Sequence, residues 1–153
     1  MPTLAYNKKV KFDYKILEIF EAGLQLTGQE VKSIKTGHIS LKGAYITTKT
    51  VKRKSEAYLI NAHIPPYKMA GPLPDYNPER SRKLLLHRKE INHLTGKLKE
   101  RGLTLVPIKV YTKHNKIKLE FGVGRGKKKV DKRELIKKRD IEKQIRRKII
   151  SEH

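Results

Sequence analysis

The apolar residues that could form a hydrophobic core lie almost entirely before Gly124. Up to that point β-branched and aromatic residues recur in short runs, whereas residues 125–153 contain no aromatic residue and only isolated aliphatic ones in a background of charge. A segment of that composition cannot bury enough apolar surface to form its own core. We therefore predict a folded body over residues 1–124 and a basic C-terminal tail over residues 125–153.

The charge of the chain restricts what it can work beside. Its 153 residues include 37 Lys and Arg against 15 Asp and Glu, so the formal net charge is 37 − 15 = +22. Such a chain repels itself and is expected to act next to an anionic partner, either nucleic acid or an acidic membrane surface. The N-terminus has no apolar stretch long enough for a signal peptide, and no segment could span a bilayer. We expect a cytoplasmic protein without membrane association.

Short runs rich in β-branched and aromatic residues predict strands. They cover residues 13–26, 44–51, 56–64, 103–111 and 116–123. A bend or a bulge is expected near Ala22-Gly23, and Pro107 should occupy an edge or a bulge because it cannot donate to the ladder.

Two helices are expected between these strands. Thr27 and Glu30 have the spacing of a capping box, which predicts a helix over residues 28–36 that Gly37 ends. Apolar residues spaced three and four apart predict an amphipathic helix over residues 84–101. The proline-rich segment 65–82 is expected to be a long irregular loop.

The fold class follows from these spacings. Too few residues separate most strands for parallel crossovers, so the sheet should be mostly antiparallel. Closing the sheet would also remove its exposed edges. We predict a mostly β protein with inserted helices, an antiparallel barrel of the oligonucleotide-binding type that carries a basic C-terminal tail.

Enzymatic chemistry has little support. The absence of cysteine excludes disulfides, thiolate metal sites and thiol catalysis. His87 and His93 lie six residues apart on a predicted helix and would point in different directions. The glycines from Gly122 to Gly126 do not match a dinucleotide-binding motif, and no carboxylate cluster indicates nuclease metals. We expect no metal, no cofactor and no catalysis.

The basic residues leave two interpretations open. The tail could be a solvated extension with nonspecific RNA affinity, or a segment that is disordered alone and becomes a helix when an anionic channel neutralises it. The lysines of the body should form a surface that binds phosphates. The seven tyrosines could stack on bases or simply line the barrel wall.

Four strings of residues carry a resemblance to a known family. They are EAGLQLTGQEVKSI at 21–34, RKLLLH at 82–87, GLTLVP at 102–107 and GKKKVDKR at 126–133. In this order they closely resemble the bacterial tmRNA-binding proteins, also called SsrA-binding proteins or small protein B. The resemblance extends from Asn7 to about Arg147.

The resemblance implies a specific function. Members of this family bind the tRNA-like domain of tmRNA and, with elongation factor Tu and GTP, bring alanyl-tmRNA to 70S ribosomes stalled on truncated mRNA. The tail then occupies the vacant decoding region and mRNA channel as a helix, and trans-translation tags the nascent chain. Catalysis stays with the ribosome.

The resemblance also implies site residues. On the RNA-binding side of the barrel they are Glu21, Leu85 and Lys118, with Asn7, Lys8, Lys32, Lys127 and Lys128 as weaker candidates. In the ribosome-binding tail they are Asp131, Lys132, Arg133, Ile145 and Ile149.

Three residues depart from the family pattern. Phe12 stands where many members have His, Asn77 where Asp commonly precedes Pro, and Val130 where an aromatic residue or His is more usual. The last change puts stacking on a decoding nucleotide in doubt. Two rival functions remain at this point, a ribosomal protein with a basic extension and a nuclease.

Overall fold

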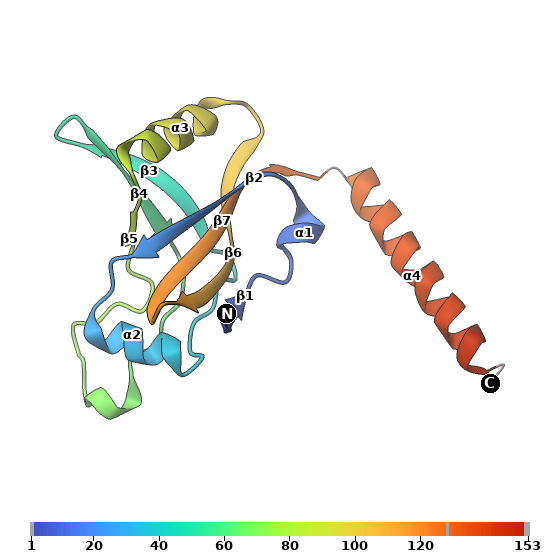
Figure 1. The fold of residues 1–153 in the computed structure, drawn as a ribbon, viewed down its shortest axis with the longest axis horizontal. Helices are drawn as coiled ribbons and strands as arrows, with labels where there is room; N and C mark the ends of the chain where they lie inside the picture. The colour runs from blue at the N-terminus through green and yellow to red at the C-terminus, as the bar shows by residue number, and fades with distance from the viewer. Residues whose placement is uncertain (1, 128, 152–153) are drawn as a thin grey trace.

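Seven strands form one antiparallel sheet in a computed structural model that describes residues 2–127 and 129–151 (Figure 1). In chain order the elements are β1 (Thr3–Tyr6), α1 (Val10–Asp13), β2 (Tyr14–Leu24), α2 (Gly28–Lys35), β3 (Tyr45–Val51), β4 (Lys54–Ile60), the 3₁₀ helix η1 (Lys68–Ala70), β5 (Arg82–Leu85), α3 (Arg88–Lys99), β6 (Leu103–Lys113), β7 (Lys116–Gly126) and α4 (Lys129–Ser151).

The sheet closes on itself. Its strand order is β1-β6-β3-β4-β5-β2-β7, and β6 also pairs with β7, so every strand except β1 belongs to a ring. β1 extends the sheet on β6, next to the one position where β3 joins β6. The predicted mostly antiparallel barrel with inserted helices is confirmed.

Two apolar clusters hold the barrel together. The main one fills the interior and includes the fully buried Leu59, Leu84, Leu105 and Phe121. A smaller one lies outside β6 and β7, where Val10 of α1 packs against β6. Burial of each large aliphatic or aromatic side chain contributes about 1.5–3 kcal/mol, so the main cluster dominates stability.

Several local predictions are confirmed. The Thr27–Glu30 capping box begins α2, and Gly37, with φ of 86°, follows its end. The strands predicted over residues 103–111 and 116–123 are present as β6 and β7, which form a hairpin around His114 and Asn115, both with positive φ. The ladder is irregular just after Pro107, as a residue without an N–H requires.

No bulge lies at Ala22-Gly23, while a bend there stays a prediction. The register of β2 against β7 shifts between Ile16 and Glu18 instead, while Gly23 pairs regularly with both neighbouring strands. The side chains of β2 keep their alternation through the shift, so that Ile16 packs in the outer apolar cluster and Leu17 is exposed.

The predicted helix over residues 84–101 begins too early. Arg82 to Leu85 form β5, in which Arg82 and Leu84 are buried and Leu85 is exposed, the alternation of a strand. α3 starts only at Arg88, after a capping box between His87 and Glu90. β5 pairs with β4 and with β2, and both strands are too distant in sequence for local periodicity to reveal the pairing.

The chain termini and loops differ in smaller ways. β1 and α1 were not predicted as elements, β4 ends at Ile60 because Asn61 has φ of 62°, and the loop over residues 65–82 contains η1 and the first residue of β5.

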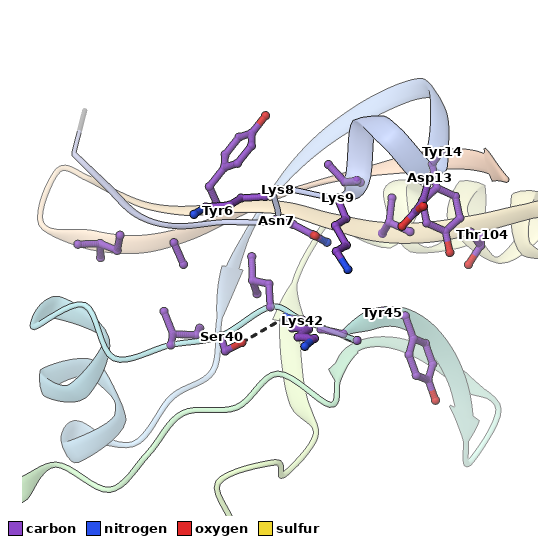
Figure 2. A pocket seen from close by; sticks show the side chains of 18 residues that line it. Tyr6, Asn7, Lys8, Lys9, Asp13, Tyr14, Ser40, Lys42, Tyr45 and Thr104 are labelled. Atoms are coloured by element: carbon purple, nitrogen blue, oxygen red, sulfur yellow. Dashed lines mark hydrogen bonds between the residues drawn. The ribbon is translucent and has the colours of Figure 1, made fainter. Parts of the chain in front are cut away.

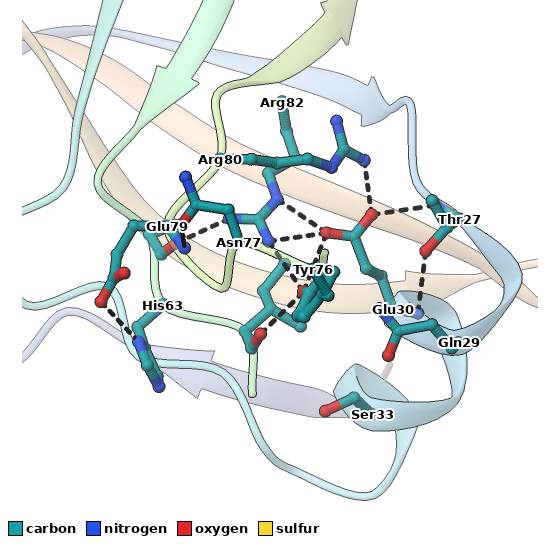
Figure 3. A network of polar contacts seen from close by, with 12 residues as sticks. Thr27, Gln29, Glu30, Ser33, His63, Tyr76, Asn77, Glu79, Arg80 and Arg82 are labelled. Carbon is teal, nitrogen blue, oxygen red and sulfur yellow. Dashed lines mark hydrogen bonds and ion pairs between the residues drawn. The ribbon is translucent and has the colours of Figure 1, made fainter. Parts of the chain in front are cut away.

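A buried ion pair ties α2 to β5 (Figure 3). The side chains of Glu30 and Arg82 are both 0% exposed, and the nearest Arg82 nitrogen lies 2.6 Å from Glu30 Oε2. Arg80 and the Tyr76 hydroxyl also donate to the carboxylate, and Arg82 donates to the carbonyl oxygen of Ala62 at 2.7 Å. The network joins α2, the loop over residues 65–82 and β5.

The network also keeps Glu30 ionised. Burial opposes the charge, but the Thr27 N–H, Arg80 and Arg82 outweigh it and lower the pKa of Glu30 from 4.5 to about 2. A buried carboxylate with this many donors is stable only while all of them remain in place.

Replacing Glu30 by Gln leaves Arg82 charged and buried without a counter-ion. We expect the free energy of unfolding, measured by urea denaturation at neutral pH, to fall by about 3–5 kcal/mol. Because the folded pKa of Glu30 is lowered, its contribution is present above pH 4.5 and is lost as pH falls from 4.5 towards 2. The variant should lack that part of the acid sensitivity. The control is Glu90→Gln, and equal stability of the two variants would contradict the role of the ion pair.

Candidate nucleic-acid interface

The outer face of the barrel brings together Glu21, Leu85 and Lys118. Leu85 on β5 and Lys118 on β7 both lie opposite Gly23 on β2, and Glu21 precedes Gly23 by two residues. Paired residues, and residues two apart along a strand, project from the same face of a sheet. Three side chains predicted from separate parts of the sequence therefore share one face, and their contact with RNA stays a prediction.

A shallow cleft lies beside Leu85. The side chain of Leu85 is 56% exposed and rests over Gly23, where an added Cβ atom would lie 3.4 Å from Leu85 Cδ1. The cleft has a volume of about 350 Å³ and is lined by Gly23, Leu24, Leu26, Val31, Leu85, Asn115, Lys116, Ile117 and Lys118. An apolar floor beside two ammonium groups suits a nucleotide whose base contacts the floor and whose phosphate meets the lysines.

Glu21 is an ionised acceptor on this face. The Tyr111 hydroxyl donates to Glu21 Oε2, and Lys113 Nζ lies 3.3 Å from Oε1. The hydrogen bond from Tyr111, followed by the charges of Lys113 and Lys118, lowers the pKa of Glu21. Burial and the same hydrogen bond raise the pKa of Tyr111. A carboxylate in this state can accept hydrogen bonds from ribose hydroxyls or base amino groups.

Asn7 and Lys8 lie at a different hollow (Figure 2). It has a volume of about 670 Å³ and separates the N-terminal segment 4–14 from the segment 39–45, and it shares no lining residue with the cleft beside Leu85. Asn7 Nδ2 donates to the carbonyl oxygen of Pro107 at 3.0 Å, so this amide holds the N-terminal segment on β6. The structure does not bring Asn7 and Lys8 together with Glu21.

The other weak candidates are dispersed. Lys32 lies on α2 with its Nζ atom 5.9 Å from the centre of the Tyr67 ring. Lys127 Nζ donates to the carbonyl oxygen of Lys11 at 2.7 Å, which ties the root of the tail to α1. Lys128 lies outside the described residues.

The tail residues lie on α4, which extends away from the barrel (Figure 1). Arg133 and Ile145 are exposed, whereas the side chains of Asp131, Lys132 and Ile149 are outside the described part of the structure. The tail forms the helix that was predicted for its bound state, and disorder of the tail in the free protein stays a prediction. The guanidinium carbon of Arg139 lies 5.7 Å from the centre of the Phe12 ring, a cation–π contact with α1.

Sequence reasoning missed two groups of residues. Tyr111 and Lys113 were not selected, although they hold Glu21 from 90 and 92 residues away in the chain. Lys42 and Tyr45 form one wall of the large hollow, opposite Asn7 and Lys9 (Figure 2). The register shift after Pro107 reverses the alternation of β6, which puts Val110 in the interior and Tyr111 on the opposite face, and no local signal pairs Tyr111 with Glu21.

Within residues 2–127 and the described part of α4, no group of three or more His, Asp or Glu residues could hold a metal ion. Among the helices described, none is long and apolar enough to cross a membrane.

Tyr111→Phe removes the hydrogen bond that most lowers the pKa of Glu21. We expect that pKa to move back towards 4.5, followed by NMR titration of the Glu21 carboxyl group. Tyr45→Phe, a change at the separate large hollow, serves as the control and should leave the pKa of Glu21 unaltered. An unchanged Glu21 titration in Tyr111→Phe would mean that the lysines alone set it.

The chain is similar to several known proteins. The chain is 50% identical over 141 residues to an SsrA-binding protein of Gloeothece citriformis, and the aligned region covers 92% of this chain and 88% of the relative. It is 50% identical over 145 residues to an SsrA-binding protein of Mesoplasma florum, 95% of each chain. A chain in a solved structure described as "tmRNA-SmpB: a journey to the center of the bacterial ribosome" matches with a TM-score of 0.66 at 38% identity, over 86% of this chain and 93% of that one. The sequence profile described as "SmpB protein" matches residues 4–151. The chain belongs to the SmpB protein family.

Proposed function

We propose that this protein binds the tRNA-like domain of tmRNA and delivers it to ribosomes stalled on truncated mRNA for trans-translation. The observation that carries the proposal is the separation of two cationic parts, a closed barrel with a nucleotide-sized cleft and a charged helix that extends away from it. The names of the relatives, SsrA-binding proteins, and of the similar ribosome-related structure support this choice.

In this proposal the body, residues 1–124, grips a folded RNA. Leu85 contacts an exposed nucleotide, Lys118 meets a phosphate, and Glu21 accepts a hydrogen bond from a sugar or base. Folded RNA offers its shape, phosphates and 2′-hydroxyl groups more readily than its base edges. Such contacts recognise tmRNA by architecture with little reading of sequence.

The tail, residues 125–153, has the second role. Arg133 and Ile145, together with Asp131, Lys132 and Ile149, act in the vacant decoding region and the downstream mRNA channel of the 70S ribosome. Ribosomal RNA there supplies the counter-charge that α4 lacks alone. Because mRNA and the tail cannot occupy the channel together, an empty channel becomes the signal for rescue.

Three further parts belong to the same proposal. Alanyl-tmRNA brings elongation factor Tu and GTP to the complex, the protein works in the cytoplasm, and it catalyses no reaction itself. If the protein were instead a constitutive ribosomal protein, it would bind all ribosomes. Incubation with labelled tmRNA and Mg²⁺ addresses the nuclease rival, since cleavage at stoichiometric protein would contradict our proposal.

Leu85→Ala and Lys118→Gln test the body. We expect each to weaken binding of the tRNA-like fragment of tmRNA, by about 1–3 kcal/mol if Leu85 stacks on a base. Lys118→Gln should also lower the slope of log affinity against log salt by about 1. Filter binding at several salt concentrations measures both. Met69→Ala, which removes an exposed apolar side chain of η1 that does not line the cleft, is the matched control and should bind normally.

Truncation after Lys129 tests the tail. The shortened protein should bind tmRNA within several-fold of the full chain, because the barrel is intact, but should not support tagging on stalled ribosomes. A reconstituted translation assay with truncated mRNA measures tagging. Normal tagging by the truncated protein would show that the tail has been given the wrong role.

A further inference from the structure

The β3–β4 hairpin extends past the barrel as a two-stranded ribbon. β3 and β4 pair with each other as far as Val51 and Lys54. Among the described residues, however, β6 joins β3 only at Ile46, and β5 joins β4 only at Tyr58 and Leu59. The outer half of the hairpin therefore pairs only with itself, and it projects at the upper left of Figure 1, beside α3.

The end of this ribbon is strongly basic. Residues 49–54 are all exposed and comprise Lys49, Thr50, Val51, Lys52, Arg53 and Lys54, without an acidic residue. The adjacent carboxylate, Glu56, already pairs with Arg88 at 3.0 Å and Lys83 at 3.8 Å. Within the described part of the chain, none of the four cations at the tip forms a salt bridge, and Lys49 lies 5.6 Å from the centre of the Tyr58 ring. We call Lys49, Lys52, Arg53 and Lys54 the ribbon tip.

The turn itself is built from unfavourable residues. Lys52 and Arg53 have φ of 50° and 66°. A two-residue hairpin turn with two positive φ values favours Asn-Gly, because residues other than glycine and asparagine rarely adopt this region. Two long cationic side chains thus occupy positions where they oppose the turn and repel each other. Residues that break a local rule in this way are often retained for binding.

The ribbon is braced by side-chain contacts directly below its tip. Arg88 at the start of α3 donates to the carbonyl oxygen of Ser55 and pairs with Glu56. The hydroxyl groups of Thr50 and Ser55 are joined across the ribbon at 3.0 Å. A charged tip on a braced support loses less conformational entropy on binding than a flexible loop would.

We propose that the ribbon tip is a further phosphate-binding element of this protein, separate from the face of Glu21, Leu85 and Lys118 and from the tail. Its ligand is the sugar–phosphate backbone of a folded RNA, held by charge and position without base reading. None of its residues lines the cleft beside Leu85 or the large hollow. The proposal rests on the proposed function in taking RNA as the ligand, and both the tRNA-like part of tmRNA and ribosomal RNA offer that chemistry.

The double substitution K52N/R53G tests the proposal without endangering the fold. Asn-Gly is the preferred sequence for this turn, so the melting temperature should be unchanged or higher. The full-length variant is titrated separately with the tRNA-like fragment of tmRNA and with 70S ribosomes programmed with truncated mRNA. For whichever of these two RNAs binds the ribbon tip, we expect the affinity to fall about tenfold at moderate salt. The slope of log affinity against log salt should fall by about 1–2.

The matched control is K35Q/K68Q, which removes two exposed lysines from α2 and η1. These elements lie at the lower end of the barrel in Figure 1, away from the ribbon. An equal loss of affinity in the control would show an effect of net charge alone and overturn the proposal. Unchanged affinity and slope for K52N/R53G in both arms would overturn it as well, while leaving the proposed function intact. Failure of the unsubstituted protein to bind either RNA would overturn both.

Discussion

The Glu30–Arg82 ion pair is the interaction on which the arrangement of the barrel most depends. β5 is short and has only two paired positions with β4 and two with β2, so its backbone ladder alone holds it weakly. Its first residue, Arg82, is anchored inside the protein by a carboxylate from α2 and by the carbonyl oxygen of Ala62. The same strand ends at Leu85, so a buried ion pair determines where a residue of the outer face lies.

The distribution of charge relates the barrel to the tail. Every charged side chain whose burial the structure describes, except Glu30 and Arg82, lies at least partly at the surface, because the interior is apolar. The surplus of positive charge is therefore spread over the outside, on the barrel face, the ribbon tip and α4. α1 connects the barrel to the tail. Val10 of α1 packs against β6, the Lys127 N–H donates to the carbonyl oxygen of Asp13, and Phe12 contacts Arg139 of α4.

Local features were predicted well where their causes are local. The capping box of Thr27 and Glu30, the β6–β7 hairpin and the irregularity after Pro107 all arise from residues a few positions apart. β5 was mistaken for the beginning of a helix because three successive leucines fit either element until distant strands flank them. Glu21, Leu85 and Lys118 came from resemblance to a family, and their shared face depends on pairings between three strands.

Composition and spacing are enough to predict the general architecture of the molecule. Its aromatic residues and apolar runs end near Gly124, its cations greatly outnumber its acids, and its strands are too close together for parallel crossovers, so an antiparallel cationic body with a charged extension is expected. Two arrangements depend instead on the tertiary structure: Tyr111 holds Glu21, and Lys52 and Arg53 stand at the end of a ribbon whose outer strands pair only with each other. Composition and periodicity act over a few residues, whereas closure of the sheet sets which distant strands become neighbours, and that closure depends on the packing of the whole core.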